Sequence, residues 1–202
     1  MVPRLIGYCC SQPPVMRRRQ EIVPRASGRV LELGAGGGAN LGLYDRRKVE
    51  SVIGIDPSEG LIARAECVKA AYGSDFFRIE RGIAEDLPFP DASFDTVVAT
   101  FTLCSVQDHQ LALKEAARVL IPGGRLLFLE HGLSPDADIR RWQRRIEPVW
   151  KHIAGGCHLT RPVTDSIVGA GFAVPERHGS YMEQSPRFAG WVEWGEAIPQ
   201  AV

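Results

Sequence analysis

The chain has 202 residues, of which 45% are hydrophobic and 24% are charged, a composition typical of a globular protein that can bury a core without disulfides. Lys and Arg number 24, as do Asp and Glu, so the formal net charge is zero, which argues against nucleic acid as a partner. No apolar run reaches the length of a membrane span, so we expect no stable membrane insertion and a cytoplasmic location.

Helical and strand-like segments alternate along the chain. In chain order we predict a helix over residues 14–23, a strand over 29–33, a short helix over 39–44, strands over 49–55 and 76–81 with a helix over 59–72 between them, a strand over 94–100, a helix from 108 to about 120, a strand over 125–130, a mostly helical region over 135–171, and closing strands over 172–180 and 187–196. This alternation indicates an α/β fold with a parallel sheet and right-handed crossovers. The three arginines at 17–19 are expected on a solvated helix face.

Five cysteines are present, namely Cys9, Cys10, Cys67, Cys104 and Cys157. An odd number with no CxxC spacing suits neither a disulfide framework nor a zinc site. We therefore predict reduced thiols and no bound metal.

A glycine-rich turn follows the first predicted strand, where residues 32–38 read ELGAGGG. Glycines let the backbone turn tightly and let a ligand approach main-chain N–H groups. Asp56 ends the second strand, 22 residues after Gly34. A carboxylate at that place can accept hydrogen bonds from both hydroxyls of a ribose.

Two ligand classes fit this turn. Gly34, Gly36 and Ala39 satisfy the nicotinamide-dinucleotide fingerprint, which keeps a dehydrogenase open as an alternative. Glu32 favours a cationic ligand, such as the sulfonium and amino groups of S-adenosylmethionine, and is a poor neighbour for a pyrophosphate. The three consecutive glycines at 36–38 also depart from the usual dinucleotide spacing.

Five motifs in series favour S-adenosylmethionine over a nicotinamide dinucleotide. They read ELGAGGG at 32–38, IGIDP at 53–57, AEDLPF at 84–89, FDTV at 94–97 and RVLIPGG at 118–124. Their order resembles that of class I S-adenosylmethionine-dependent methyltransferases. The resemblance implies a Rossmann-like fold with a mostly parallel seven-stranded sheet and an antiparallel last strand. It also implies a single methyltransferase domain over 1–202, with an N-terminal leader over the ligand site (1–28), a cofactor-binding core (29–131) and a substrate side (132–202).

The same resemblance assigns cofactor contacts residue by residue. The implied binding set is Glu32, Gly34, Ala35, Gly36, Asp56, Pro57, Ala84, Glu85, Thr100 and Phe101. In this set the glycines pass the methionine portion, Asp56 holds the ribose, and Thr100 and Phe101 face the methyl group. One departure concerns adenine: many members carry Asp where this chain has Ile83, so the contact falls to Glu85, a main-chain group or packing.

The acceptor is indicated by three further stretches, TLCSVQ at 102–107, LEHG at 129–132 and EPVWKHIAGGCHLTR at 147–161. Together they resemble the animal thiol methyltransferases of the methyltransferase-like branch, without the N-terminal membrane anchor of those enzymes. The implied function is methyl transfer to a small-molecule nucleophile, with a thiol as first choice. The alternatives are N-, O- or C-methylation of a lipid, quinone or secondary metabolite, and a protein that binds S-adenosylmethionine without catalysis.

Candidate catalytic residues are His131, after the fifth parallel strand, and His158, beside Cys157. His131 is expected to act as a base or to orient the substrate, although a loop-pinning role for the Glu130–His131 pair is equally open. The expected substrate-binding residues are Tyr8, Trp150, His152 and Arg161. A small molecule is the expected partner, and either a monomer or a homodimer is compatible with the sequence.

Overall fold

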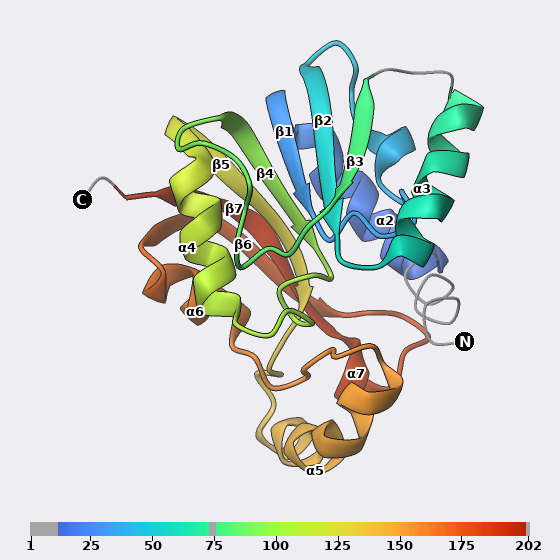
Figure 1. Cartoon of the computed structure of the whole chain (residues 1–202). Helices are drawn as coiled ribbons and strands as arrows, with labels where there is room; N and C mark the ends of the chain where they lie inside the picture. The colour runs from blue at the N-terminus through green and yellow to red at the C-terminus, as the bar shows by residue number, and fades with distance from the viewer. Residues whose placement is uncertain (1–11, 73–75, 201–202) are drawn as a thin grey trace.

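A single sheet of seven strands forms the centre of the protein, which is described by a computed structural model for residues 12–72 and 76–200 (Figure 1). The strand order is β3-β2-β1-β4-β5-β7-β6, and β7 runs antiparallel to both of its neighbours. The strands are β1 (Gly28–Leu33), β2 (Val49–Asp56), β3 (Phe77–Arg81), β4 (Phe94–Thr100), β5 (Leu120–His131), β6 (Phe172–Tyr181) and β7 (Trp191–Pro199). The predicted α/β fold with an antiparallel last strand is confirmed.

Helices cover both faces of this sheet (Figure 1). α2 (Pro13–Ile22) and α3 (Glu59–Tyr72) lie on one face, and α4 (His109–Val119) and α6 (Val163–Gly169) lie on the other. α5 (Ala137–Ile153) and α7 (Arg187–Gly190) lie beyond the end of the sheet, and two short 3-10 turns are η1 (Val23–Arg25) and η2 (Leu41–Leu43). Asp108 starts α4 as predicted, because its side chain accepts the N–H groups of Gln110 and Leu111. Within the described residues, no helix is long and apolar enough to cross a bilayer.

Side chains of the central strands alternate between two apolar clusters. Val97 and Ala99 of β4 point to the face covered by α4 and α6, whereas Val98 points to the face covered by α2 and α3. All three side chains are fully buried. Burial on both sides explains why β4 reads as a continuous apolar run in the sequence.

Three predicted boundaries are wrong. The helix expected over 39–44 is only the turn η2, because Asn40 is drawn into the interior by hydrogen bonds to Glu32 and Thr100. β5 begins at Leu120 rather than Arg125, since the strand continues through the Pro-Gly-Gly segment with a register shift against β4. The strand expected over 187–196 begins only at Trp191, because the residues after Pro186 form the short helix α7.

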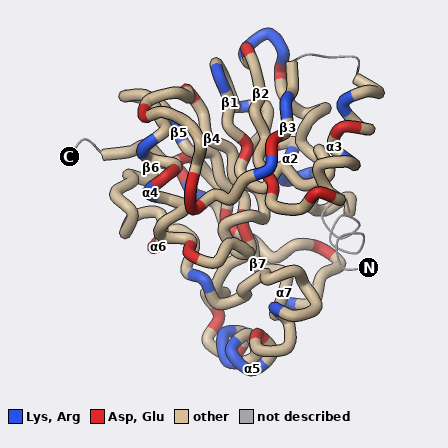
Figure 2. The backbone as a smooth tube through the Cα atoms, in the orientation of Figure 1, with Lys and Arg blue, Asp and Glu red and all other residues tan. Residues whose placement is uncertain are grey.

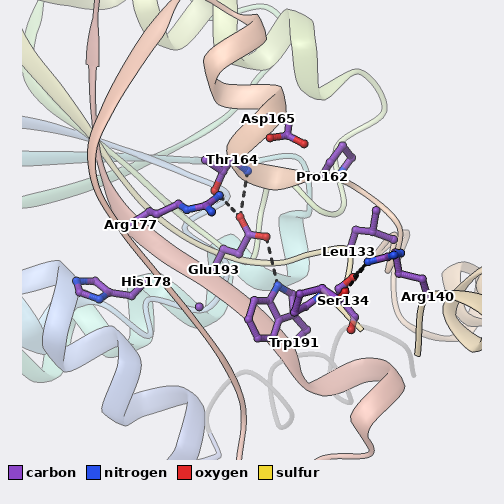
Figure 3. Close-up of a pocket in the computed structure, with 12 residues that line it drawn as sticks. Leu133, Ser134, Arg140, Pro162, Thr164, Asp165, Arg177, His178, Trp191 and Glu193 are labelled. Atoms are coloured by element: carbon purple, nitrogen blue, oxygen red, sulfur yellow. Dashed lines mark hydrogen bonds between the residues drawn. The ribbon is translucent and has the colours of Figure 1, made fainter. Parts of the chain in front are cut away.

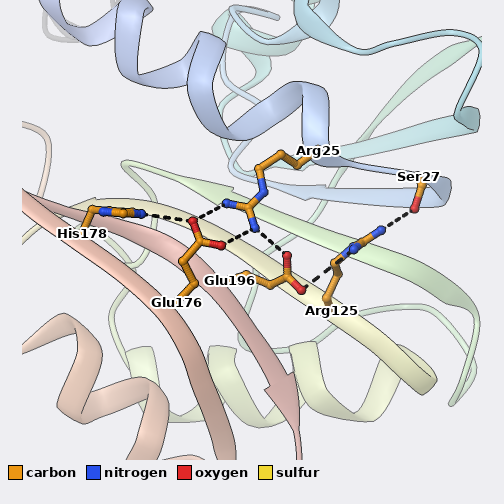
Figure 4. Close-up of polar contacts among 6 residues, drawn as sticks. All are labelled: Arg25, Ser27, Arg125, Glu176, His178 and Glu196. Atoms are coloured by element: carbon orange, nitrogen blue, oxygen red, sulfur yellow. Dashed lines mark hydrogen bonds and ion pairs between the residues drawn. The ribbon is translucent and has the colours of Figure 1, made fainter.

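Charged residues join the N-terminal segment to the antiparallel side of the sheet (Figure 4). Arg25 of η1 forms ion pairs of 2.8 Å with Glu176 of β6 and with Glu196 of β7. Arg125 of β5 lies 3.9 Å from Glu196 and donates a hydrogen bond to Ser27. These partly exposed pairs contribute modestly to stability, but they fix where α2 meets the sheet.

α5 lies beyond the end of β5, and Gln143 is its one buried side chain. Its amide accepts the N–H of Ser134 and donates to the carbonyl of Gly132. Most of the remaining helix surface is exposed, including Trp142 at 55% and Val149 at 64%. Lys and Arg residues are concentrated along this helix (Figure 2).

Candidate active site

The glycine turn lies where β1 ends, next to the segment that follows β4. Gly34 and Gly36 have φ values of +62° and +56°, a region that glycine adopts without steric cost. A Cβ atom on Gly34 would fall on the side chain of Thr102. The Thr102 hydroxyl itself donates to the carbonyl of Leu33 at 2.7 Å. The turn is therefore tightly packed against the end of β4, at the switch point between β1 and β4 where ligands of this fold class bind.

Asp56 ends β2 and lies beside this turn, as the sequence predicts. Its two carboxylate oxygens accept the N–H groups of Gly36 at 3.0 Å and Ser58 at 2.8 Å. Burial raises the pKa of Asp56, against the effect of these two hydrogen bonds. A carboxylate has about four acceptor positions, so two positions remain for the hydroxyls of a ribose. Pro57 follows directly on the exposed surface.

Glu32 is buried within β1, below the turn. Its oxygens accept hydrogen bonds from Asn40 Nδ2 at 2.9 Å and from the Tyr44 hydroxyl at 2.7 Å. Burial raises the pKa of Glu32 to about 7, although Tyr44, Arg19 and Asn40 all favour the ionised form. The carboxyl group is therefore poised between its neutral and ionised forms near neutral pH.

Arg19 of α2 reaches the same place, and the sequence analysis missed it. The side chain is only 5% exposed, whereas the arginines at 17–19 were predicted to be solvated. Its Nη1 donates to Asn40 Oδ1 at 2.8 Å and to Thr100 Oγ1 at 2.6 Å, and its guanidinium lies 5.3 Å from the ring of Phe101. Nε is buried without a hydrogen-bond partner, and no carboxylate of the described residues lies within ion-pair distance. The nearest carboxyl group, that of Glu32, interacts with Arg19 only across Asn40. A buried cation with no carboxylate in direct contact is costly, which marks this position as one that can receive an anion.

The expected adenine contacts lie on the other side of Asp56. Ala84 is buried in the core. The carboxylate of Glu85 accepts the N–H groups of Gln107 at 2.7 Å and Asp108 at 3.2 Å, so it holds the entrance to α4. Ile83 is half exposed. It stands at the position where the resemblance to class I methyltransferases leads us to expect an acidic residue. Ala35, next in the turn, is buried and donates its N–H to Ile55.

The segment after β4 is anchored by one buried carboxylate, that of Glu130. It accepts the N–H groups of Thr102, Leu103 and Cys104 at 2.9, 3.0 and 3.1 Å. Burial raises the pKa of Glu130 in spite of these bonds. Phe101 precedes this anchored segment with φ of +57°, an uncommon conformation for a residue with a side chain. Loop pinning is thus a role of Glu130.

The side chain of His131, at the end of β5, makes none of these hydrogen bonds to the segment after β4. Its ring centroid lies 4.8 Å from that of Phe101, and its Nδ1 lies 3.7 Å from Cys157 Sγ. A hydrogen bond from Cys104 and the proximity of His131 lower the pKa of the Cys157 thiol, while the pKa of Cys104 is raised. Phe101, His131 and two sulfur atoms therefore meet at the carboxyl ends of β4 and β5, where the resemblance places the methyl group.

The other candidate residues occupy different places. The His158 ring makes a hydrogen bond to Glu147 at 3.0 Å, whereas its main-chain N–H donates to the carbonyl of Cys104 at 2.7 Å. The guanidinium of Arg161 donates to the carbonyls of Leu103 and Val106, so it braces the segment after β4 from behind. The Arg161 side chain thus supports the segment after β4, and the His158 side chain is held by Glu147.

Trp150 and His152 belong to the last turns of α5. The Trp150 ring packs edge-on against Phe188 at 5.8 Å, and its buried Nε1 makes no hydrogen bond within the described chain. The indole of Trp150 also favours the thiolate form of Cys157 and so lowers the pKa of that thiol. His152 is exposed. Tyr8 lies outside the described residues.

A cavity of about 390 Å³ lies elsewhere, between the start of α6 and strands β6 and β7 (Figure 3). None of the residues of the glycine turn, Asp56, Phe101 or His131 line it. Glu193, which points into it, already accepts hydrogen bonds from Thr164 and from the indole of Trp191. This cavity is therefore separate from the group of side chains at the ends of β4 and β5.

A Rossmann-like sheet with a glycine turn and a strand-end carboxylate defines an α/β protein built for an adenosyl ligand. The family described as "Methyltransferase domain" matches residues 31–128. The chain is 36% identical over 178 residues to thiol S-methyltransferase TMT1B of Homo sapiens, covering 86% of this chain and 70% of that protein. The chain belongs to the class I S-adenosylmethionine-dependent methyltransferases, a family in which S-adenosylmethionine is the methyl donor.

Other relatives mark the limits of this likeness. The rat thiol S-methyltransferase TMT1B is 38% identical over 147 residues, and the chain spans only 59% of its length. Phosphatidylethanolamine N-methyltransferase of Cereibacter sphaeroides is 39% identical over 116 residues, which cover 57% of this chain and 56% of that protein. Among solved structures, a methyltransferase-like protein of Bacillus halodurans has a TM-score of 0.75 at 18% identity, over 92% of this chain and 99% of that one; at that identity it supports the fold alone.

Proposed function

We propose that the protein transfers the methyl group of S-adenosylmethionine to a small thiol. The observation that carries this proposal is the extent of the likeness to the human thiol S-methyltransferase, which covers 86% of the chain. Such coverage cannot be confined to residues 31–128, which match the methyltransferase family in general. It must include part of the acceptor side, whereas the likeness to the phosphatidylethanolamine enzyme covers 57% of the chain.

The donor fits the described site in one orientation. Asp56 has two acceptor positions left for the ribose hydroxyls, and the backbone at Gly34 and Gly36 runs beside it. Arg19 would pair with the carboxylate of the methionine portion, because a buried guanidinium with no carboxylate in direct contact gains most from such a partner. Glu32, ionised, would balance the positive charge of the amino and sulfonium groups.

In this orientation the methyl group points to the ends of β4 and β5. Methyl transfer is an in-line displacement, for which the enzyme must align donor and nucleophile and exclude water. Phe101 and His131, with ring centroids 4.8 Å apart, would form one wall of the acceptor position, and His131 would orient the thiol. A thiol suits this position because it needs little activation: the pKa of a free cysteine thiol is about 8.5.

The test is release of S-adenosylhomocysteine from the purified chain with a matched acceptor panel. The panel contains alkyl and aryl thiols, the corresponding amines and phenols, a quinol and dispersed phosphatidylethanolamine. We expect turnover with thiols well above that with the oxygen and nitrogen analogues. Preferential turnover of the lipid or the quinol would replace the thiol by that acceptor class. Binding of S-adenosylmethionine with no turnover of any compound or of a cell extract would indicate a non-catalytic binding protein.

A further inference from the structure

Three soft ligand groups from distant parts of the chain converge beside the proposed methyl position. Cys104 follows β4, His131 ends β5, and Cys157 follows α5. Their two sulfur atoms and a ring nitrogen all lie within 4.8 Å of one another. Cys104 and Cys157 are buried, whereas His131 is partly exposed. The spacing of the cysteines along the chain did not predict this cluster.

The separations in the cluster are close to those of a tetrahedral metal site. Zinc binds thiolate sulfur at about 2.3 Å and imidazole nitrogen at about 2.0–2.1 Å, so ligand atoms around it lie about 3.5–3.8 Å apart. The observed separation of Cys157 Sγ and His131 Nδ1 is 3.7 Å. The third ligand atom, Cys104 Sγ, lies within 4.8 Å of both others, about 1 Å or less outside the tetrahedral range.

The backbone that carries these ligands is held from several sides. The N–H of Cys104 is bound by the buried carboxylate of Glu130, and its carbonyl accepts the N–H of His158 at 2.7 Å. Glu147 holds the His158 ring and the N–H of Thr160, so the chain on the far side of Cys157 is fixed as well. Supporting contacts of this kind are what orient ligands in functional metal sites.

We propose that Cys104, His131 and Cys157 bind one thiophilic divalent cation, Zn²⁺ in the first place, and that its fourth coordination position receives the acceptor thiol. Two cysteines and one histidine form a three-ligand set that leaves one position open, as in catalytic zinc sites. The open position lies beside the partly exposed His131, whose ring packs on Phe101 at the donor side. The role of the metal in binding the acceptor rests on the proposed thiol function, whereas metal binding itself does not.

The chemistry of the step balances without a further reactant. The thiol loses its proton to solvent when its sulfur coordinates the cation, which keeps the sulfur as a thiolate at neutral pH. A sulfur lone pair then attacks the methyl carbon, so a new S–CH₃ bond forms as the sulfonium S–CH₃ bond breaks. The electron pair of the broken bond stays on the leaving sulfur of neutral S-adenosylhomocysteine. The product thioether is a weaker ligand than a thiolate and leaves the cation.

The first measurement is metal binding to the full chain, after treatment with chelator and thiol reductant, in the absence of any substrate. Zn²⁺ is titrated against a chromophoric chelator, and Co²⁺ is used to report thiolate ligands through its charge-transfer band. We expect one site per chain, and at least about 100-fold weaker binding in Cys104→Ser, Cys157→Ser and His131→Ala, since loss of a supporting contact alone costs about 10- to 100-fold.

Controls address other cysteines and the fold. Cys67→Ser removes an exposed free cysteine, and a Cys9→Ser/Cys10→Ser double variant removes the two that lie outside the described residues; both are expected to keep the site. Affinity for S-adenosylhomocysteine, measured for every variant, shows that the cofactor side remains folded. Absence of a stoichiometric site in the wild type, or a site lost only with Cys9 and Cys10, would overturn the proposal.

A second measurement separates the metal from the acceptor. Addition of a thiol to the Co²⁺ protein should shift the charge-transfer band, and removal of the metal should lower thiol methylation at least tenfold, with recovery on addition of Zn²⁺. A stoichiometric site whose spectrum responds to no thiol, in a protein that methylates no thiol, would retain the metal site and reject the thiol function. Full thiol methylation by the metal-free protein would reject the catalytic role of the metal.

Discussion

Arg19 Nη1 lies 2.6 Å from the hydroxyl oxygen of Thr100, so the N-terminal helix α2 places a cation at the end of the central strand β4. This contact is buried. Nη1 also donates a hydrogen bond to Asn40, and both Thr100 and Asn40 are neutral. The guanidinium therefore enters the site with hydrogen bonds to neutral groups, and the carboxyl group of Glu32 interacts with it only at longer range. This relationship leads to the first prediction.

Arg19→Met is expected to weaken S-adenosylhomocysteine binding about 10- to 100-fold, the range for loss of hydrogen bonds to a charged group. The methionine side chain keeps the apolar contact with Phe101 but removes the charge. Isothermal titration calorimetry would measure the change. Methylthioadenosine, which lacks the carboxylate and the amino group, supplies the matched ligand, and its affinity should be the same in both proteins. Equal losses for the two ligands would show that Arg19 only supports the fold.

Asp56→Asn tests the ribose contact. The substitution leaves one acceptor oxygen and replaces the other by a donor, so we expect about tenfold or greater loss of S-adenosylhomocysteine affinity. Asp56 also binds the N–H groups of Gly36 and Ser58, so the substitution alone does not isolate the ribose contact. Measuring the 2′-deoxy analogue of the ligand with both proteins gives a double-mutant cycle that does. Removal of the hydroxyl should weaken binding to the wild type much more than to the variant. The ribose assignment fails if the two proteins respond alike to its removal.

Local sequence patterns predicted the positions of those site residues that lie within or next to a motif. The glycine turn, Asp56 and the strand order follow from local patterns, because glycine spacing and apolar runs are set by backbone geometry over a few residues. The position of His131 at the end of β5 follows for the same reason. Its partners Cys104 and Cys157 did not, because only the tertiary fold brings positions 26 or more apart into contact.

The burial of Arg19 could not be predicted from the sequence for a different reason. Three consecutive arginines in a short helix have the pattern of a solvated surface, and Arg17 indeed forms an exposed ion pair with Glu183. One position further along, the side chain of Arg18 stacks over Trp194, and the next turns into the interior. Which of three identical residues is buried depends on how α2 rotates against the sheet, and that rotation is fixed by contacts such as Arg25 with Glu176.

Glu130→Gln is expected to loosen the segment after β4. The carboxylate accepts three main-chain N–H groups, and an amide NH₂ would face at least one of these donors instead of accepting it. We expect a loss of about 1–3 kcal/mol in the free energy of unfolding or of local opening. Hydrogen exchange at Thr102, Leu103 and Cys104 would measure it, with the exposed Glu50→Gln as control. Unchanged exchange at these three amides would contradict the anchoring role.

Glu32 is expected to make the stability of the ligand-free protein depend on pH. Its pKa is about 7 in the folded protein and near 4.5 when exposed. Because the folded state holds the proton more tightly, the stabilisation is complete below about pH 4.5 and is lost as pH rises to about 7. The full loss corresponds to about 3 kcal/mol in the free energy of unfolding. Denaturant unfolding at a series of pH values would measure it.

Glu32→Gln supplies the reference for this dependence, because the amide cannot ionise while Asp56 and Glu130, whose pKa values are also raised, remain in both proteins. The stability of the wild type relative to the variant should fall between about pH 4.5 and 7 and then stay level. A bound sulfonium ligand favours the ionised carboxylate, so the affinity of the wild type for S-adenosylmethionine should rise over the same interval and that of Glu32→Gln should not. A parallel pH profile of affinity in the two proteins would place the ligand charge away from Glu32.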